Sequence, residues 1–306
     1  MSAARAPSAR LAPAFVWAVW ALMTLVALAC IVRYGRNIPL AEDWLMVPPM
    51  TGHEPHLASW LWAQNNEHRL PLPRLILLGV LSATHDFRAG MVLNVLSLAA
   101  LAAAMILTAR WLRNGVTRAS DAFFPLALLH LGDWENLVWA WQFQFVSSAV
   151  LICALMLAVA RQRGAPTMRQ TIVAGLSLVL LPLTGASGLV FALALAPWAA
   201  WVGTVQLRAA RAAGESGTRG ALLLGSAIAA PLLVGVYFIG YVRPWWNPPN
   251  PGRLQTLKTT LRFLALAWGA AARNAWGIAI VAIILVLAAT LLVLVRALAR
   301  ARGAER

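Results

Sequence analysis

Long apolar runs, separated by short polar segments, repeat along the whole chain. A helix needs about 20 apolar residues to cross a bilayer. Six runs approach or exceed that length and predict membrane-spanning helices at residues 12–32, 90–109, 138–160, 187–205, 220–242 and 275–296. A water-soluble domain would not be apolar around its whole circumference. The pattern therefore predicts an all-α, polytopic membrane protein.

Four shorter apolar runs decide the number of crossings. Runs 121–131 and 170–184 predict weaker spans, as hairpin arms or partly recessed segments. Run 71–83 follows a proline-rich turn and carries Arg74, whereas run 254–271 is amphipathic, which suits a helix lying in the membrane interface. With these last two runs lying flat as interfacial helices, we expect about eight crossings.

The arginines support this count. Short cytoplasmic loops of membrane proteins carry an excess of Lys and Arg. Eight crossings with both termini inside bring every cluster of arginines to one side, namely Arg5/Arg10, Arg110/Arg113/Arg118, Arg161/Arg163/Arg169, Arg208/Arg211/Arg219 and Arg296/Arg300/Arg302/Arg306. If run 71–83 crossed alone, the second cluster would lie outside. We therefore expect residues 1–306 to form a single membrane domain with a basic cytoplasmic tail at 296–306.

Composition agrees with this topology. The chain has 306 residues, of which 61% are hydrophobic and 11% charged, and its formal net charge is +15. The basic residues are scattered through short loops, so they indicate topology rather than a nucleic-acid surface. Cys30 and Cys153 lie inside apolar runs, and no structural disulfide is expected. The first apolar run follows Arg5 and Arg10 and is predicted to be a retained signal anchor.

Residues 33–89 form a long outer loop that concentrates titratable side chains. Connections this long are more often functional than not. The predicted topology places seven of the ten acids and all five histidines on the outer side: Glu42, Asp43, Glu54, Glu67, Asp86, Asp133, Glu135, His53, His56, His68, His85 and His130. Titratable groups gathered on one face suggest chemistry there.

Several motifs in and after this loop resemble a known class. EDW, then LWAQNNEHRLPLPR, then GDWENLVWAWQFQF and YVRPWWNPPNP look like a group of uncharacterised bacterial members of the GT-C class of integral-membrane glycosyltransferases. That class includes protein O-mannosyltransferases and lipid A aminoarabinose transferases. The resemblance spans most of the chain. It implies transfer of a sugar from a polyprenyl-phosphate carrier to an acceptor on the outer membrane face.

The resemblance assigns the acid that acts on the acceptor to Asp43, with Glu42 as the second choice. A carboxylate at the membrane boundary suits a general base, because partial desolvation raises its pKa. The alternative reading is that Asp43 caps a short helix after Pro39.

Phosphate binding is the second role that the resemblance implies. Arginine offers a planar fork for two phosphate oxygens, and the leaving phosphate needs fixed positive charge. Arg88 matches the family's first-loop arginine, and Arg69 is a further candidate together with His68 and Glu67 as donor-binding residues. A solvated polar turn, a structural Glu–Arg pair at 67–69, or an interfacial anchor at Arg88 are the alternatives.

Later segments add candidates for substrate contact. Asp133 and Glu135 are a possible second acidic site, or the cap of a membrane hairpin. Gln142 could hydrogen-bond a sugar hydroxyl, since an amide entering a span needs a partner. Trp245 could stack on a sugar or prenyl chain, or mark an interfacial stop before a proline-rich linker.

No cofactor is indicated. A divalent metal is possible, but the spacing of His53, Glu54 and His56 matches no known metal motif, and no metal ligand is assigned. The expected partners are membrane lipid, a polyprenyl-phosphate-linked sugar and possibly another subunit, but no nucleic acid. A bacterial inner-membrane location is expected.

Two rival functions remain open. The first is a transporter or flippase for a lipid-linked substrate, which would normally carry ionisable groups near the bilayer midplane or internal repeats. The spans show no repeat, and their charged or histidine residues lie at or near span ends, namely Asp121, His130 and Arg296. The second is an inactive accessory subunit, because members of the GT-C class are usually longer than this chain.

Overall fold

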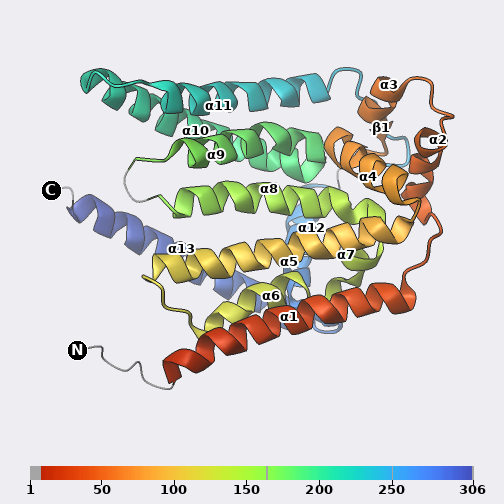
Figure 1. The fold of residues 1–306 in the computed structure, drawn as a ribbon, viewed down its shortest axis with the longest axis horizontal. Coiled ribbons are helices and arrows are strands. Elements are labelled where there is room, and N and C mark those ends of the chain that lie inside the picture. The colour runs from red at the N-terminus through yellow and green to blue at the C-terminus, as the bar shows by residue number, and fades with distance from the viewer. Residues whose placement is uncertain (1–7, 163–164, 250, 305–306) are drawn as a thin grey trace. The chain divides into compact units, whose positions relative to one another are not determined.

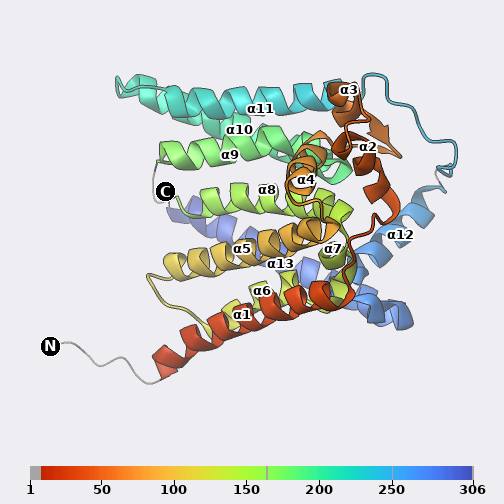
Figure 2. The ribbon, with the colours of Figure 1, turned by 45° about the vertical axis from the view of Figure 1, so that its right-hand side comes forward.

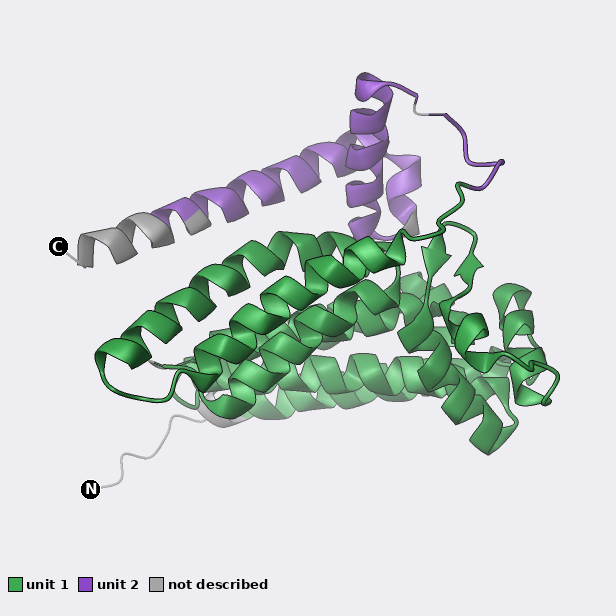
Figure 3. Cartoon of the chain, turned by 90° about the horizontal axis from the view of Figure 1, so that it is seen from above, with its two compact units in different colours: residues 1–243 green, residues 244–306 purple. Residues whose placement is uncertain are grey.

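The computed structural model describes residues 8–162, 165–249 and 251–304. Contacts divide the chain into two compact units, residues 1–243 and 244–306 (Figure 3), where the sequence predicted one membrane domain. Within the described ranges, six helices are long and apolar enough to cross a membrane. They lie in α1 Ser8–Tyr34, α5 Phe87–Leu112, α8 Phe143–Ala160, α10 Ala186–Ala212, α11 Thr218–Tyr237 and α13 Trp276–Ala304. The all-α, multi-pass architecture and the six long spans are confirmed.

The first unit is a bundle of helices that run side by side (Figure 1). Packing contacts link α1 to α5, α5 to α8, α8 to α9 (Met168–Leu180) and α9 to α11, which also packs against α10. A 3₁₀ turn, η5 Leu181–Thr184, extends α9 to the predicted end of run 170–184. This segment lies along the bundle as the sequence predicted, although it is shorter than the six long spans.

The second weak span, 121–131, is not one helix. It contains the end of η2 Ala119–Ala122, α6 Phe123–Leu128 and the start of η3 Leu131–Asp133. Two more short elements, α7 Trp134–Val138 and η4 Ala140–Gln142, follow before α8. His130 and Trp139 adopt extended backbone between these pieces. The Asn94 side chain donates to the Trp139 carbonyl at 2.9 Å, and that carbonyl also accepts the Gln142 N–H at 3.2 Å, so α5 is bonded to the chain at this break.

The loop between α1 and α5 is folded. It contains η1 Ala41–Met46, α2 Val47–Met50, α3 Leu57–Trp62, β1 Gln64–Asn65, β2 His68–Arg69 and α4 Pro71–Thr84. We call residues 35–86 the cap, because these elements gather at one end of the bundle (Figure 2). Met46, Leu70, Leu77 and Leu81 are almost fully buried in a core shared with α1, α5 and α8. The cap is therefore packed onto the bundle rather than suspended above it.

The opposite end of the bundle holds the carboxyl ends of α5, α8 and α10 (Figure 1). The arginines of the predicted inner loops lie there, including Arg110, Arg161 and Arg211. The two ends thus differ in charge as the predicted topology requires.

The second unit contains α12 Arg253–Ala265, η6 Leu266–Trp268, η7 Ala270–Asn274 and α13. Run 254–271 was predicted as a single interfacial helix. Its α-helix ends at Ala265 and continues as η6 to Trp268, where Gly269 with a φ of 90° turns the chain towards η7. Ala265, Ala272, Ala279 and Ile283 form the small core of this unit.

Candidate functional site

Asp43 is the most deeply buried carboxylate of the cap, with no exposed surface. Its Oδ2 accepts the Leu40 N–H at 3.2 Å, and its Oδ1 accepts the Trp141 N–H at 3.0 Å. Burial raises the pKa of Asp43 to about 6, although these two hydrogen bonds oppose the shift. Asp43 therefore caps η1, as the alternative reading of the sequence held, and also ties η1 to η4 of the bundle.

Glu42 precedes it and is half-buried. Its Oε2 is buried and has no hydrogen-bond partner among the described residues. The negative charge of Glu42 is one of the causes that raise the pKa of Asp43. The pair thus combines a fully bonded carboxylate with one whose oxygen is still available.

Arg69 connects the cap to the end of α11. Its Nε donates to the Tyr237 carbonyl at 2.9 Å, Nη1 to Trp62 at 2.7 Å and Nη2 to Ile239 at 2.9 Å. Its backbone N–H also donates to the Tyr237 hydroxyl at 2.9 Å. Three of the five guanidinium N–H groups thus serve main-chain carbonyls, which makes Arg69 a clamp between distant segments.

Gln64 completes this connection. Its Nε2 donates to the Val242 carbonyl at 2.6 Å, and its Oε1 accepts the Val242 N–H at 3.0 Å. The short hairpin pairs Gln64 with Arg69, and Asn66 turns it with a φ of 51°, a conformation that asparagine tolerates. The polar NNEHR segment therefore serves largely to join the cap to residues 237–242.

Glu67 and His68 lie at the tip of this hairpin and are partly exposed, with 4.0 Å between His68 Nε2 and Glu67 Oε2. His68 Nδ1 is buried without a hydrogen-bond partner among the described residues. These two side chains remain open to a ligand in a way that the Arg69 side chain is not.

Arg74 was noted in the sequence but not assigned to the site. It is 3% exposed, and burial lowers its pKa to about 10. Its Nη1 donates to the carbonyls of Trp60 and Ala63, both at 2.6 Å, and its guanidinium lies over the rings of Trp60 and Trp141. The sequence feature that could have identified Arg74 is its position as a lone arginine in an apolar run. Such an arginine is buried on folding, and a buried cation needs several partners.

Arg88 has a different environment. It pairs with Asp86, 2.6 Å between Arg88 Nη2 and Asp86 Oδ2, and its side chain is 50% exposed. Asp86 also accepts the Arg88 N–H and caps α5, and hydrogen bonds from Arg88 lower the pKa of Asp86. Arg88 lies at the cap end of the bundle with half of its surface free.

Of the later candidates, Gln142 belongs to η4, the segment that Asp43 contacts through the Trp141 N–H. Asp133 and Glu135 are exposed, and Asp133 Oδ2 accepts from Asn136 at 2.6 Å. Gln142 is buried, and its Oε1 has no partner in the described ranges. Trp245 is 91% exposed and belongs to the second unit.

A metal site receives no support from the cap histidines. His53 Nδ1 lies 2.9 Å from Thr51 Oγ1, and Glu54 Oε1 accepts the His56 N–H. Within the part of the chain that the structure describes, no three His, Cys, Asp or Glu side chains are grouped to hold a metal ion.

An apolar cavity of about 650 Å³ is linked to Asp43 through Leu40, although neither Glu42 nor Asp43 is among its lining residues. It lies between the end of α1, the start of the cap, α5 and α7, and its lining includes Tyr34, Arg36, Leu40, Met91 and Trp134. Leu40 belongs to the wall of the cavity and donates its N–H to Asp43. The sequence did not single out Arg36, which supplies the cation of this cavity.

Neither a protein-family model nor a curated protein nor a solved structure matches the chain.

Proposed function

We propose that this multi-pass membrane protein is a glycosyltransferase that moves a sugar from a polyprenyl-phosphate carrier to an acceptor hydroxyl at the cap end. The observation that carries the proposal is the position of Leu40, which both lines an apolar cavity and binds the buried Asp43. An apolar wall, a cation and a carboxylate removed from water are the groups that a prenyl chain, its phosphate and an attacking hydroxyl require.

In the proposed reaction, the acceptor oxygen bonds to the anomeric carbon while the bond from that carbon to the phosphate oxygen breaks. The acidic pair takes the hydroxyl proton, and polyprenyl phosphate leaves with the electron pair. A base with a pKa near the working pH is effective in such a step, and Asp43 has a pKa of about 6. Asp43 must first release the N–H of Leu40 or Trp141, whereas Glu42 Oε2 has no bond to release.

Arg36 is the arginine that the cavity presents to the phosphate in this proposal. Arg88 is half exposed and could bind a second phosphate oxygen only by giving up part of its contact with Asp86. Arg69 instead holds the cap in place, since its nitrogens donate to three carbonyls. The proposal also places the cap outside a bacterial inner membrane and the arginine-rich end inside.

The test is transfer of radiolabelled sugar from a polyprenyl-phosphate donor in proteoliposomes. We expect wild type to transfer, and Asp43→Asn, Glu42→Gln and Arg36→Gln each to lower the rate, the most affected acid by about 10²–10⁴-fold. Glu215→Gln, an exposed acid at the opposite end, is the matched control and should retain the wild-type rate.

Each rival gives a different result in the same vesicles. Movement of the intact lipid-linked sugar across the membrane without transfer would identify a flippase. Donor binding with neither transfer nor movement would identify an accessory subunit. Full activity in both acid variants would refute the assigned base.

A further inference from the structure

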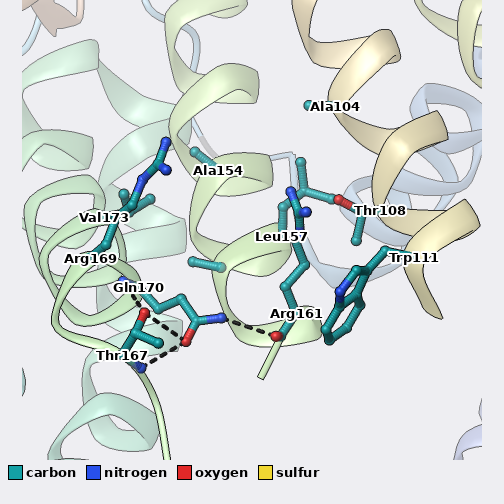
Figure 4. A pocket seen from close by; sticks show the side chains of 11 residues that line it. Ala104, Thr108, Trp111, Ala154, Leu157, Arg161, Thr167, Arg169, Gln170 and Val173 are labelled. Atoms are coloured by element: carbon teal, nitrogen blue, oxygen red, sulfur yellow. Dashed lines mark hydrogen bonds between the residues drawn. The ribbon is translucent and has the colours of Figure 1, made fainter. Parts of the chain in front are cut away.

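A second cavity lies at the arginine-rich end, far along the bundle from the cap. It has a volume of about 480 Å³, within the range of ligand sites. Its floor is α8, and its sides are α5 and α9, two helices that both pack on α8. Figure 4 shows Arg161 and Arg169 on either side of this groove.

Neither the Arg161 nor the Arg169 guanidinium has a carboxylate partner within the described ranges of the chain. Arg161 lies over the Trp111 ring, with 5.8 Å to its centroid. A neighbouring cavity of about 440 Å³ is also lined by Arg161 and Trp111, and Arg110 lines it as well. Positive charge therefore continues beyond the groove.

The groove also offers hydrogen-bond donors. Thr108 Oγ1 is buried without a partner in the described structure, although the residue lines the groove. The amino end of α9 opens on the same space, and helix amino ends favour anions. Gln170 holds the amino end of α9 against the end of α8. Its Nε2 donates to the Arg161 carbonyl at 3.0 Å, and its Oε1 accepts the Thr167 N–H at 2.8 Å.

The groove also has apolar lining. Ala104, Ala154, Leu157 and Val173 lie among the arginines and other polar residues that line it. Neighbouring side chains such as Leu107 and Ile172 are exposed on the predicted lipid-facing surface. A free phosphate would contact only the polar lining, whereas an amphiphile would contact the polar and the apolar lining.

We propose that this groove binds an anionic phospholipid, with its phosphate diester between Arg161 and Arg169 and the start of its acyl chains along α5 and α8. Basic pockets between membrane helices are suited to such headgroups. The site is separate from the acidic pair and does not depend on the proposed transferase activity.

The test uses the full chain purified in detergent, with binding of phosphatidylglycerol and phosphatidylcholine followed by native mass spectrometry. We expect wild type to prefer phosphatidylglycerol. Arg161→Gln with Arg169→Gln should weaken that binding by about fivefold for each arginine. The matched control, Arg208→Gln with Arg211→Gln, removes the same charge from exposed positions of α10 and should change binding less than twofold.

A second variant keeps the charge and fills the groove. Ala154→Phe places a ring against the apolar wall and should also weaken phosphatidylglycerol binding, while gel filtration monitors the fold. Equal losses in the two arginine double variants, or unchanged binding in Ala154→Phe, would overturn the proposal. Displacement of the lipid by millimolar inorganic phosphate would overturn it too, by assigning the site to a free anion.

Discussion

Asp43 illustrates how a single carboxylate can organise a membrane-boundary segment. The sequence left its role as a cap of a short helix after Pro39 open as the alternative to catalysis, and the structure shows the capping bond to the Leu40 N–H. Its second partner, the Trp141 N–H, is 98 residues away and belongs to a break in the helical ladder. No local sequence pattern indicates that bond. The sequence could therefore suggest the helix-capping bond of Asp43, but not its hydrogen bond to Trp141.

Asp43 should also make stability depend on pH. Its pKa rises from an ordinary 3.8 to about 6, so the folded protein binds a proton more tightly than the unfolded chain between these values. Acidification from pH 7 to pH 4 should therefore stabilise the fold, by about 2 kcal/mol from this group. Melting temperatures in detergent micelles at pH 4, 5.5 and 7 measure the effect.

Two variants isolate that contribution. Asp43→Asn should lose the gain on acidification, whereas Asp133→Asn, an exposed acid of the same end, should retain it. Parallel pH profiles for wild type and Asp43→Asn would contradict the prediction.

Arg69 should contribute more to stability than Arg88. Arg69→Met leaves the carbonyls of Trp62, Tyr237 and Ile239 without their donors, and unsatisfied buried groups are costly. We expect the free energy of unfolding to fall by roughly 3 kcal/mol. Faster proteolysis of the cap is the measurement. Arg88→Met breaks only an exposed ion pair and should leave the stability almost unchanged. Equal protease sensitivity of the two variants would show that Arg69 is no clamp.

At the scale of elements, hydrophobic runs predicted the long helices well because a span needs only length and apolar composition. They predicted the weak span 121–131 less well, since the chain there forms the short elements η2 and α6 and then extended backbone at His130. The Asn94 bond to Trp139, further along, joins two segments that are far apart in the sequence, and a run of apolar residues does not reveal it.

The contact between α10 and α11 depends on glycine. A Cβ at Gly220 would lie 2.7 Å from the Gly203 carbonyl oxygen, so only glycine permits this approach. Gly220→Val should destabilise the pair by about 1–3 kcal/mol through overpacking. Gly225→Val in the same helix is the control, because nothing lies within 4 Å of its added Cβ. Thermal unfolding in micelles compares the two, and similar melting temperatures would contradict the predicted contact.

At the scale of the molecule, the charge difference between the two ends predicts a topology. After Cys30 and Cys153 are replaced by alanine, a cysteine at Glu54 in the cap should react with a membrane-impermeant maleimide added outside cells. A cysteine at Glu215 should react only after the membrane is opened, because it lies at the arginine-rich end. The opposite labelling pattern would invert the orientation and remove the cap from the outer face.

The bonds that join the cap to the end of α11 also constrain the order of biosynthesis. Gln64 and Arg69 emerge from the ribosome about 170 residues before Tyr237, Ile239 and Val242, which complete their hydrogen bonds. At about 5–20 residues per second, that interval is roughly 10–30 s. During this interval Arg69 in the new hairpin has not yet met the carbonyls of Tyr237 and Ile239 to which it donates in the folded protein. The cap therefore cannot form all of its hydrogen bonds while the earlier helices insert. It completes them only after α11 has been synthesised.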